Sequence, residues 1–134
     1  MIKTALTGYA GSLLTLVVLD AIWLGLVART FYRDQLGELM LPQPNLGIAA
    51  IFYLFFTIAV VMLAVMPALS SASFARSLLF GAVLGLAAYG TYDITNLSTL
   101  KGWPLTVSIV DMIWGTFVTA ATAGGGYAAA RYFA

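Results

Sequence analysis

The stretch Leu46–Met66, LGIAAIFYLFFTIAVVMLAVM, contains no charged residue. A helix needs roughly 20 apolar residues to cross the hydrocarbon core of a bilayer, which is about 30 Å thick. The run also lacks the alternation of apolar and polar residues that is typical of a strand in a membrane barrel. We therefore expect residues 46–66 to form a membrane-spanning helix.

Three further windows of the chain satisfy the same length requirement. They are residues 5–28, 78–97 and 105–129. The first run starts after Lys3 and continues past Asp20 to Ala28 without an A-x-A cleavage site, which favours a retained span over a signal peptide. Helices satisfy their backbone hydrogen bonds internally, as a bilayer requires. The sequence therefore predicts an all-α polytopic membrane protein, a four-transmembrane-helix bundle that forms a single transmembrane domain over residues 1–134.

The composition of the chain excludes several classes of function. Of the 134 residues, 62% are hydrophobic and 8% are charged, and the formal net charge is +1. This balance provides no basic surface for a nucleic acid. Because the chain has no cysteine and no histidine, we expect no haem, zinc or iron–sulfur site of the usual kind and no imidazole catalysis. A hard divalent cation such as Mg²⁺, Ca²⁺ or Mn²⁺, held by carboxylate oxygens, is the metal hypothesis that this composition leaves open.

Residues 30–41 form the only long polar connection between the spans. Their apolar members Phe31, Leu36, Leu39 and Met40 recur at near-helical spacing, with charged residues between them. This pattern predicts a short amphipathic segment at the membrane interface after the first span. The alternative is a frayed extension of the first span itself.

The lysines and arginines divide evenly between the two sides of the membrane. With four spans, one side carries Lys3, Arg76 and Arg131, and the other carries Arg29, Arg33 and Lys101. The excess of positive charge that normally sets orientation is therefore missing. Either topology is open, and so is an antiparallel homodimer that uses both, as in the small multidrug transporters, although that likeness is architectural only.

Three aspartates lie inside the spans, in the same half of the bilayer. Asp20 lies toward the end of the first span, Asp93 near the end of the third and Asp111 near the start of the fourth. Because these span ends meet at one side of the membrane, we expect the three carboxyls to line one cup that opens to that side. The polar and aromatic residues expected at the same level are Tyr53, Tyr89, Tyr92, Thr95, Asn96, Trp23 and Trp114. The charge partners expected at the mouth of the cup are Arg29, Arg33 and Lys101.

Buried carboxyls need a compensating interaction. A carboxylate at membrane depth costs at least about 2.5 kcal/mol on insertion scales, so each must be paired, protonated, hydrogen-bonded or metal-bound. If the three face one another, repulsion and desolvation favour a bound proton, and the cluster titrates as one unit. The alternative is that each aspartate accepts hydrogen bonds from its neighbours and only fixes helix packing.

Two kinds of short motif concern the packing of the spans. The segments DAIW at Asp20–Trp23 and DMIW at Asp111–Trp114 each put an acid and an indole on one helical face, so we expect the two copies to line opposite walls of one cavity. Gly81 and Gly85 in the third span, with Gly124–Gly126 in the fourth, have the small-residue pattern of helices that pack closely. We expect this packing within the chain, and the alternative is self-association between copies.

The run Tyr92–Pro104, YDITNLSTLKGWP, together with DAIWL from Asp20 and DMIWG from Asp111, resembles a bacterial family of small membrane proteins catalogued as domain of unknown function 2177. The likeness covers essentially the whole chain. It implies a four-helix, multi-pass protein of the bacterial inner (cytoplasmic) membrane, and it brings no activity with it.

Three classes of function fit an acidic, aromatic-walled cup. The first is a binding protein, or a proton-coupled transporter, that holds a small cation or the head group of an amphiphile against Trp23 and Trp114. The second is an intramembrane enzyme that acts on a lipid head group or acyl chain, with aspartates as base and acid and Lys101 or an arginine steadying an anionic group. The third is an accessory or structural membrane subunit. The partners expected are membrane lipid, the small cation or amphiphile, and a second copy of the chain in a homodimer.

Overall fold

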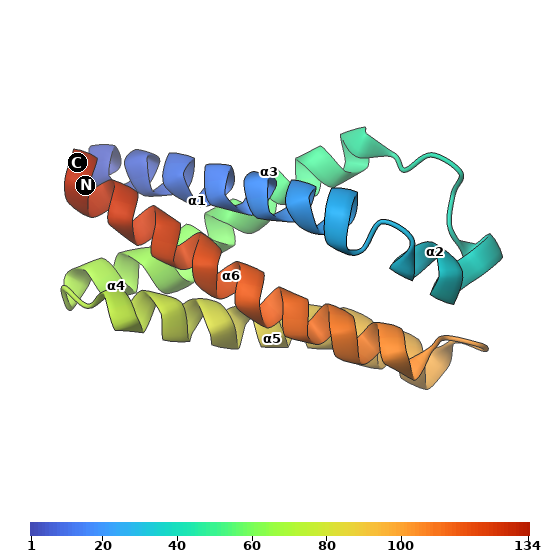
Figure 1. Ribbon diagram of the computed structural model, residues 1–134. Helices are drawn as coiled ribbons and strands as arrows, with labels where there is room; N and C mark the ends of the chain where they lie inside the picture. The colour runs from blue at the N-terminus through green and yellow to red at the C-terminus, as the bar shows by residue number, and fades with distance from the viewer.

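The computed structural model describes residues 1–134 as a helical bundle with both chain termini at one end (Figure 1). Four helical runs are long and apolar enough to cross a membrane: Ile2–Val27, Leu46–Ser70, Phe74–Thr99 and Leu105–Phe133. The predicted all-α, four-transmembrane-helix class is confirmed. In chain order the elements are α1 (Ile2–Ile22), a π-helical turn (Trp23–Val27), α2 (Phe31–Leu36), a 3₁₀ turn (Gly37–Leu39), α3 (Leu46–Val60), a second π-helical segment (Val61–Val65), α4 (Met66–Ser70), α5 (Phe74–Thr99) and α6 (Leu105–Phe133).

Helices α5 and α6 form the most extensive packing contact in the bundle. A Cβ atom on Gly81 would lie 2.6 Å from the carbonyl oxygen of Thr119, and a Cβ atom on Gly85 would overlap the backbone of Gly115. Real Cβ atoms essentially never come this close to another heavy atom. The two helices therefore approach at a distance that only glycine permits, and the expected role of Gly81 and Gly85 in packing within the chain is confirmed.

Helix α6 also packs against α1, so it is the central helix of the bundle. A Cβ atom on Gly11 would lie 2.9 Å from the carbonyl oxygen of Gly125. At the next residue of α1, the buried hydroxyl of Ser12 donates a hydrogen bond of 3.1 Å to the carbonyl oxygen of Thr122. Small and weakly polar residues thus hold α1, α5 and α6 together toward the end that carries the termini.

The second span continues past its proline. The sequence predicts that this span ends at Met66, but the helix runs through Pro67 to Ser70. Proline lacks a backbone N–H and its ring clashes with the carbonyl of the residue four positions earlier, here Leu63. The π-helical segment Val61–Val65 lies at this position, and its wider turn accommodates the proline without ending the helix.

The two halves of the second span have different neighbours. The segment Val61–Val65 and α4 pack against α5, whereas α3 packs mainly against α1. Figure 1 shows the start of α3 far from α5 and its end close to it. The bundle is therefore tightly packed at the end of the termini and splayed between α3 and α5 at the opposite end.

The connection after the first span folds as a separate segment at the splayed end of the bundle (Figure 1). The helical run ends at Val27 with a 2.6 Å hydrogen bond from the Ala28 N–H to the Trp23 carbonyl oxygen. Helix α2 then begins at Phe31 and gives way to a 3₁₀ turn at Gly37, which has a positive φ of 55°. The expected short segment is therefore present, and it is not an extension of the first span.

The close approach of α5 and α6 generates a stability prediction. The variant Gly85→Ala adds one methyl group to the α5–α6 contact, and overpacking of this kind typically costs about 1–3 kcal/mol. We expect its melting temperature in detergent to fall by at least about 3 °C. The matched control is Gly25→Ala, because a Cβ atom on Gly25 would meet nothing within 4 Å. Wild-type melting of Gly85→Ala would contradict this packing.

Candidate functional site

Asp20 is tied to two other spans by hydrogen bonds. Its side chain is only 6% exposed on α1. The Tyr53 hydroxyl donates to Oδ2 at 2.5 Å from α3, and the Trp114 indole N–H donates to Oδ1 at 2.9 Å from α6. Each oxygen therefore has a donor, so Asp20 is satisfied as a charged group without any cation.

Asp111 accepts a hydrogen bond from the short helix α2. The hydroxyl of Tyr32 on α2 donates a 2.8 Å hydrogen bond to Asp111 Oδ1, and the indole N–H of Trp23 donates a 3.1 Å hydrogen bond to the Tyr32 oxygen. Burial, and next the negative charge of Asp111, raise the pKa of Tyr32 above its usual value, so this hydroxyl keeps the proton that it donates. The other oxygen of Asp111 accepts no hydrogen bond from the protein.

The two tryptophans of the repeated motif stack on each other. The rings of Trp23 and Trp114 are parallel within 7°, and their centroids are 4.4 Å apart. Each indole N–H is hydrogen-bonded toward the acid of the other motif. Trp114 donates directly to Asp20, and Trp23 donates to Tyr32, which donates to Asp111. The acids and indoles of both motifs line one cavity, as their spacing suggested, but the stacked rings place the motifs side by side and not on opposite walls.

Asp93 is buried without a hydrogen-bond donor. It has no exposed surface, and neither Oδ1 nor Oδ2 has a partner. Its carboxyl lies within hydrogen-bonding reach of the Asp111 carboxyl on the neighbouring helix. Its backbone carbonyl accepts a 2.8 Å hydrogen bond from Ser108, whose hydroxyl in turn accepts from the Trp103 indole at 3.0 Å. Asp93 is thus a buried acid whose carboxyl has no hydrogen-bond donor and lies beside the carboxyl of Asp111.

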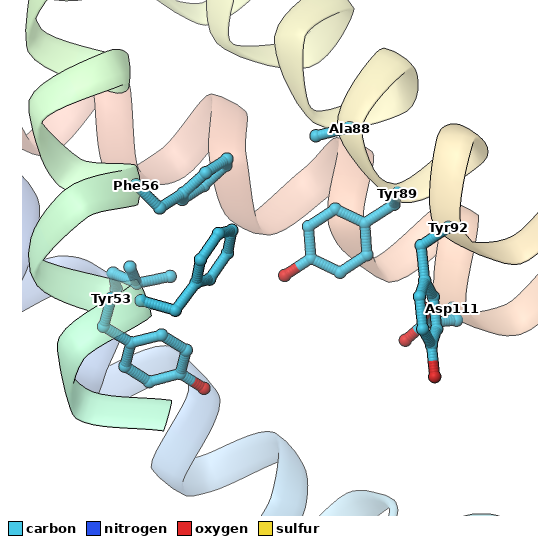
Figure 2. A pocket seen from close by; sticks show the side chains of 8 residues that line it. Tyr53, Phe56, Ala88, Tyr89, Tyr92 and Asp111 are labelled. Atoms are coloured by element: carbon cyan, nitrogen blue, oxygen red, sulfur yellow. The ribbon is translucent and has the colours of Figure 1, made fainter. Parts of the chain in front are cut away.

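A large, mainly apolar cavity lies between α3 and α5. Its volume is about 540 Å³. The lining residues are Leu16, Phe52, Tyr53, Phe56, Ala88, Tyr89, Tyr92 and Asp111. Figure 2 shows the phenol of Tyr89 extending from α5 into this space, with Tyr53 and Phe56 across from it. We call this space the apolar cavity; the carboxylate of Asp111 is the only charged group in its wall.

A second, smaller cavity lies beside the first. Its volume is about 160 Å³. The lining residues are Asp20, Trp23, Leu24, Tyr32, Tyr53, Tyr89, Asp111 and Trp114. We call it the polar chamber. It shares Tyr53, Tyr89 and Asp111 with the apolar cavity, so the two spaces adjoin along a common wall.

Several residues expected in the cup lie outside both cavities. Thr95 is exposed and Asn96 is half-buried near the end of α5, and neither lines a cavity. The expected charge partners Arg29, Arg33 and Lys101 are all exposed and line neither space. These cations lie in the connections, where long side chains reach water at little cost. Asp20 and Asp111 therefore accept hydrogen bonds from phenol and indole groups and form no ion pairs.

Tyr32 belongs to the candidate site, since it bonds Asp111 and lines the polar chamber, but the sequence does not predict it there. It lies in the polar connection, outside the spans in which candidate residues were sought. The available signal was its location on the side of the membrane that the three acids share. The aliphatic and aromatic lining of the apolar cavity, such as Leu16 and Phe56, carried no sequence signal because every span is rich in such residues.

Residues 5–128 match the model of the family described as "Predicted membrane protein (DUF2177)". The chain therefore belongs to this family, as the resemblance of its motifs indicated. No curated protein and no solved structure matches the chain.

The bond between Tyr32 and Asp111 predicts how firmly α2 is held. This six-residue helix has no side-chain cap and buries none of its residues fully. Hydrogen bonds to charged groups are worth about 1.5–3 kcal/mol. In Tyr32→Phe we expect amide hydrogen exchange in α2 to become about tenfold faster or more. Hydrogen–deuterium exchange with mass spectrometry in nanodiscs measures this, and exchange at the wild-type rate would argue against the tether. Tyr132→Phe, which alters an exposed tyrosine at the other end, is the control.

Proposed function

We propose that this member of the DUF2177 family is a membrane protein that binds an amphiphile in the apolar cavity and exchanges a proton at Asp111 and Asp93 as it does so. The observation that carries the proposal is a cavity whose wall is aliphatic and aromatic except for one carboxylate, Asp111. Its volume of about 540 Å³ falls in the usual range for small-molecule sites, roughly 300–1,000 Å³. An amphiphile matches this lining, since its chain requires the apolar wall and its head group requires the carboxylate.

The location of the cavity supports access from the bilayer. It lies where α3 diverges from α5, and the lining residues Phe52 and Tyr92 are each 56% exposed. Surface of this kind on a membrane-spanning bundle faces lipid, because a helix that crosses the hydrocarbon core is in contact with acyl chains. A molecule dissolved in the membrane therefore reaches the cavity sideways, without crossing a layer of water.

The neighbouring carboxyls support a role for a proton. If Asp93 and Asp111 were both ionised, two like charges would be desolvated side by side with no donor for Asp93. One proton shared between them gives Asp93 a hydrogen bond and leaves a single negative charge. The groups that face Asp111 are Asp20, Asp93, Tyr32, Tyr53, Tyr89 and Tyr92. None of these is a cation, so a positively charged or hydrogen-bond-donating head group is the natural replacement for the proton.

Two observations favour binding over the other functions that the sequence left open. An enzyme acting on a lipid head group was expected to use Lys101 or an arginine against an anionic group, and no such residue lines either cavity. A purely structural role requires acids whose hydrogen bonds are complete. Asp20 meets that requirement, but Asp93 does not. We also propose the bacterial inner membrane as the location and a homodimer as the assembly, because four helices alone make a narrow path for transport.

Native mass spectrometry of the purified protein tests the proposal. We expect the wild type to retain a small amphiphile, and Asp111→Asn to lower its occupancy at least about tenfold, because the charge that fixes the head group is lost. Asp34→Asn is the control, since Asp34 is exposed on α2 and lines neither cavity. Thermal melts verify that both variants are folded. Equal ligand content in folded Asp111→Asn would contradict the proposal.

The same site predicts the direction of a pH effect. A proton taken up by the carboxyl pair of Asp93 and Asp111 lowers the negative charge that attracts the head group, so we expect ligand affinity to fall as the pH is lowered and to recover as it is raised. The measurement is a set of dissociation constants at several pH values, with Asp93→Asn as the comparison. Loss of the proton partner in that variant should weaken the pH dependence, and an unchanged profile would show that the pair does not couple binding to protons.

A further inference from the structure

We propose that the polar chamber is the subsite for a compact ammonium head group, so that the ligand is an amphiphile carrying a net positive charge. This inference rests on the proposed function and deepens it by naming the class of ligand. The starting point is the adjoining geometry of the two spaces, which share Tyr53, Tyr89 and Asp111 in their walls. A molecule whose chain lies in the apolar cavity therefore places its head beside Asp111, at the mouth of the chamber.

The charges around the chamber select a cation. Asp20 faces it from α1 and Asp111 faces it from α6, and no lysine or arginine lines either cavity. Each oxygen of Asp20 has a single donor, and one oxygen of Asp111 has none, so both carboxylates retain lone pairs for the N–H groups of an ammonium. A phosphate or sulfate head would meet two negative charges there with no counter-charge.

The walls of the chamber suit a cation as well. The stacked rings of Trp23 and Trp114 and the phenols of Tyr53 and Tyr89 contribute to its lining. Aromatic faces attract ammonium groups through the ring quadrupole, and this attraction strengthens when the cation is removed from water. The volume of about 160 Å³ is roughly ten times what one water molecule requires, so an ammonium head and a few waters fit.

Asp93 is a second and independent sign that this region receives a positive group. It is fully buried, and neither of its oxygens has a partner. It lies behind Asp111 as seen from the cavities, because it lines neither of them but is within hydrogen-bonding reach of Asp111. A cation bound at Asp111 replaces the proton that the two carboxyls share, and that proton leaves to the solvent. The chamber therefore has a surface for the ammonium beside a proton that the ammonium can displace.

The test compares probes that have the same alkyl chain and different heads. We expect dodecylammonium to bind the protein in nanodiscs at least about tenfold more tightly than dodecanol, and dodecyl sulfate to bind more weakly than either. Quenching or enhancement of tryptophan fluorescence reports binding, because Trp23 and Trp114 line the chamber. Phosphatidylethanolamine is the probe that distinguishes two sources of the ammonium group, a free cationic amphiphile and a zwitterionic lipid. We expect this lipid to bind weakly, because no cation in the cavities pairs with its phosphate.

Variants then assign the preference to the chamber. We expect Asp20→Asn to reduce the preference for dodecylammonium over dodecanol at least about tenfold, and Asp34→Asn to leave it unchanged. Asp20 also holds Tyr53 and Trp114 in place, so if Asp20→Asn does not fold, the wild-type series decides alone.

The outcomes separate this inference from the proposed function. Equal affinity for dodecanol and dodecylammonium, or tight binding of phosphatidylethanolamine, would overturn the ammonium subsite and leave amphiphile binding intact. Binding of none of the probes would overturn both.

Discussion

Three carboxyl groups have to be accommodated inside a bundle that spans a membrane, and no cation is close enough to neutralise them. Asp20 and Asp111 are accommodated by donors that come from other segments of the chain: Tyr53, Trp114 and Tyr32. Each of these bonds joins two different segments of the chain. The bonds therefore fix the rotation of α1, α3 and α6 about their axes and the position of α2. Asp93 is the exception, since its carboxyl has only Asp111 beside it. The proposed proton exchange depends on this missing hydrogen-bond donor at Asp93.

The bundle is tightly packed near the chain termini and open at the opposite end, where the two cavities lie. Near the termini, glycines on α5 and α6 permit backbone approaches that no larger residue allows, and Ser12 adds a hydrogen bond between α1 and α6. At the other end, α3 diverges from α5 beyond the π-helical segment that Pro67 requires, and the two cavities occupy that region. Tight packing at one end supports an open site at the other, because a site needs walls that hold their positions when a ligand enters or leaves.

Much of this arrangement could be predicted from the sequence. A span has to cross a bilayer of known thickness, so the position of a residue along the span indicates its depth in the membrane. That argument identified four spans and placed Asp20, Asp93 and Asp111 at one level, and the structure brings these three together. Depth does not determine rotation, so the cross-connection of Trp23 and Trp114 and the outward direction of Thr95 could not be derived. The role of Tyr32 depends on how α2 folds back toward Asp111, which is a tertiary contact. The expected end of the second span at Met66 was too early, because the π-helical segment before Pro67 resolves the steric conflict of the proline within a continuous helix.

The proposed function requires a proton shared between Asp93 and Asp111. The most direct measurement is the number of protons released when a cationic amphiphile saturates the purified protein in a weakly buffered solution containing a pH-sensitive dye. We predict that the wild type releases about one proton per bound ligand, because ligand binding is linked to deprotonation of the carboxyl pair. Asp93→Asn should release much less. Ligand binding without proton release in the wild type would contradict it.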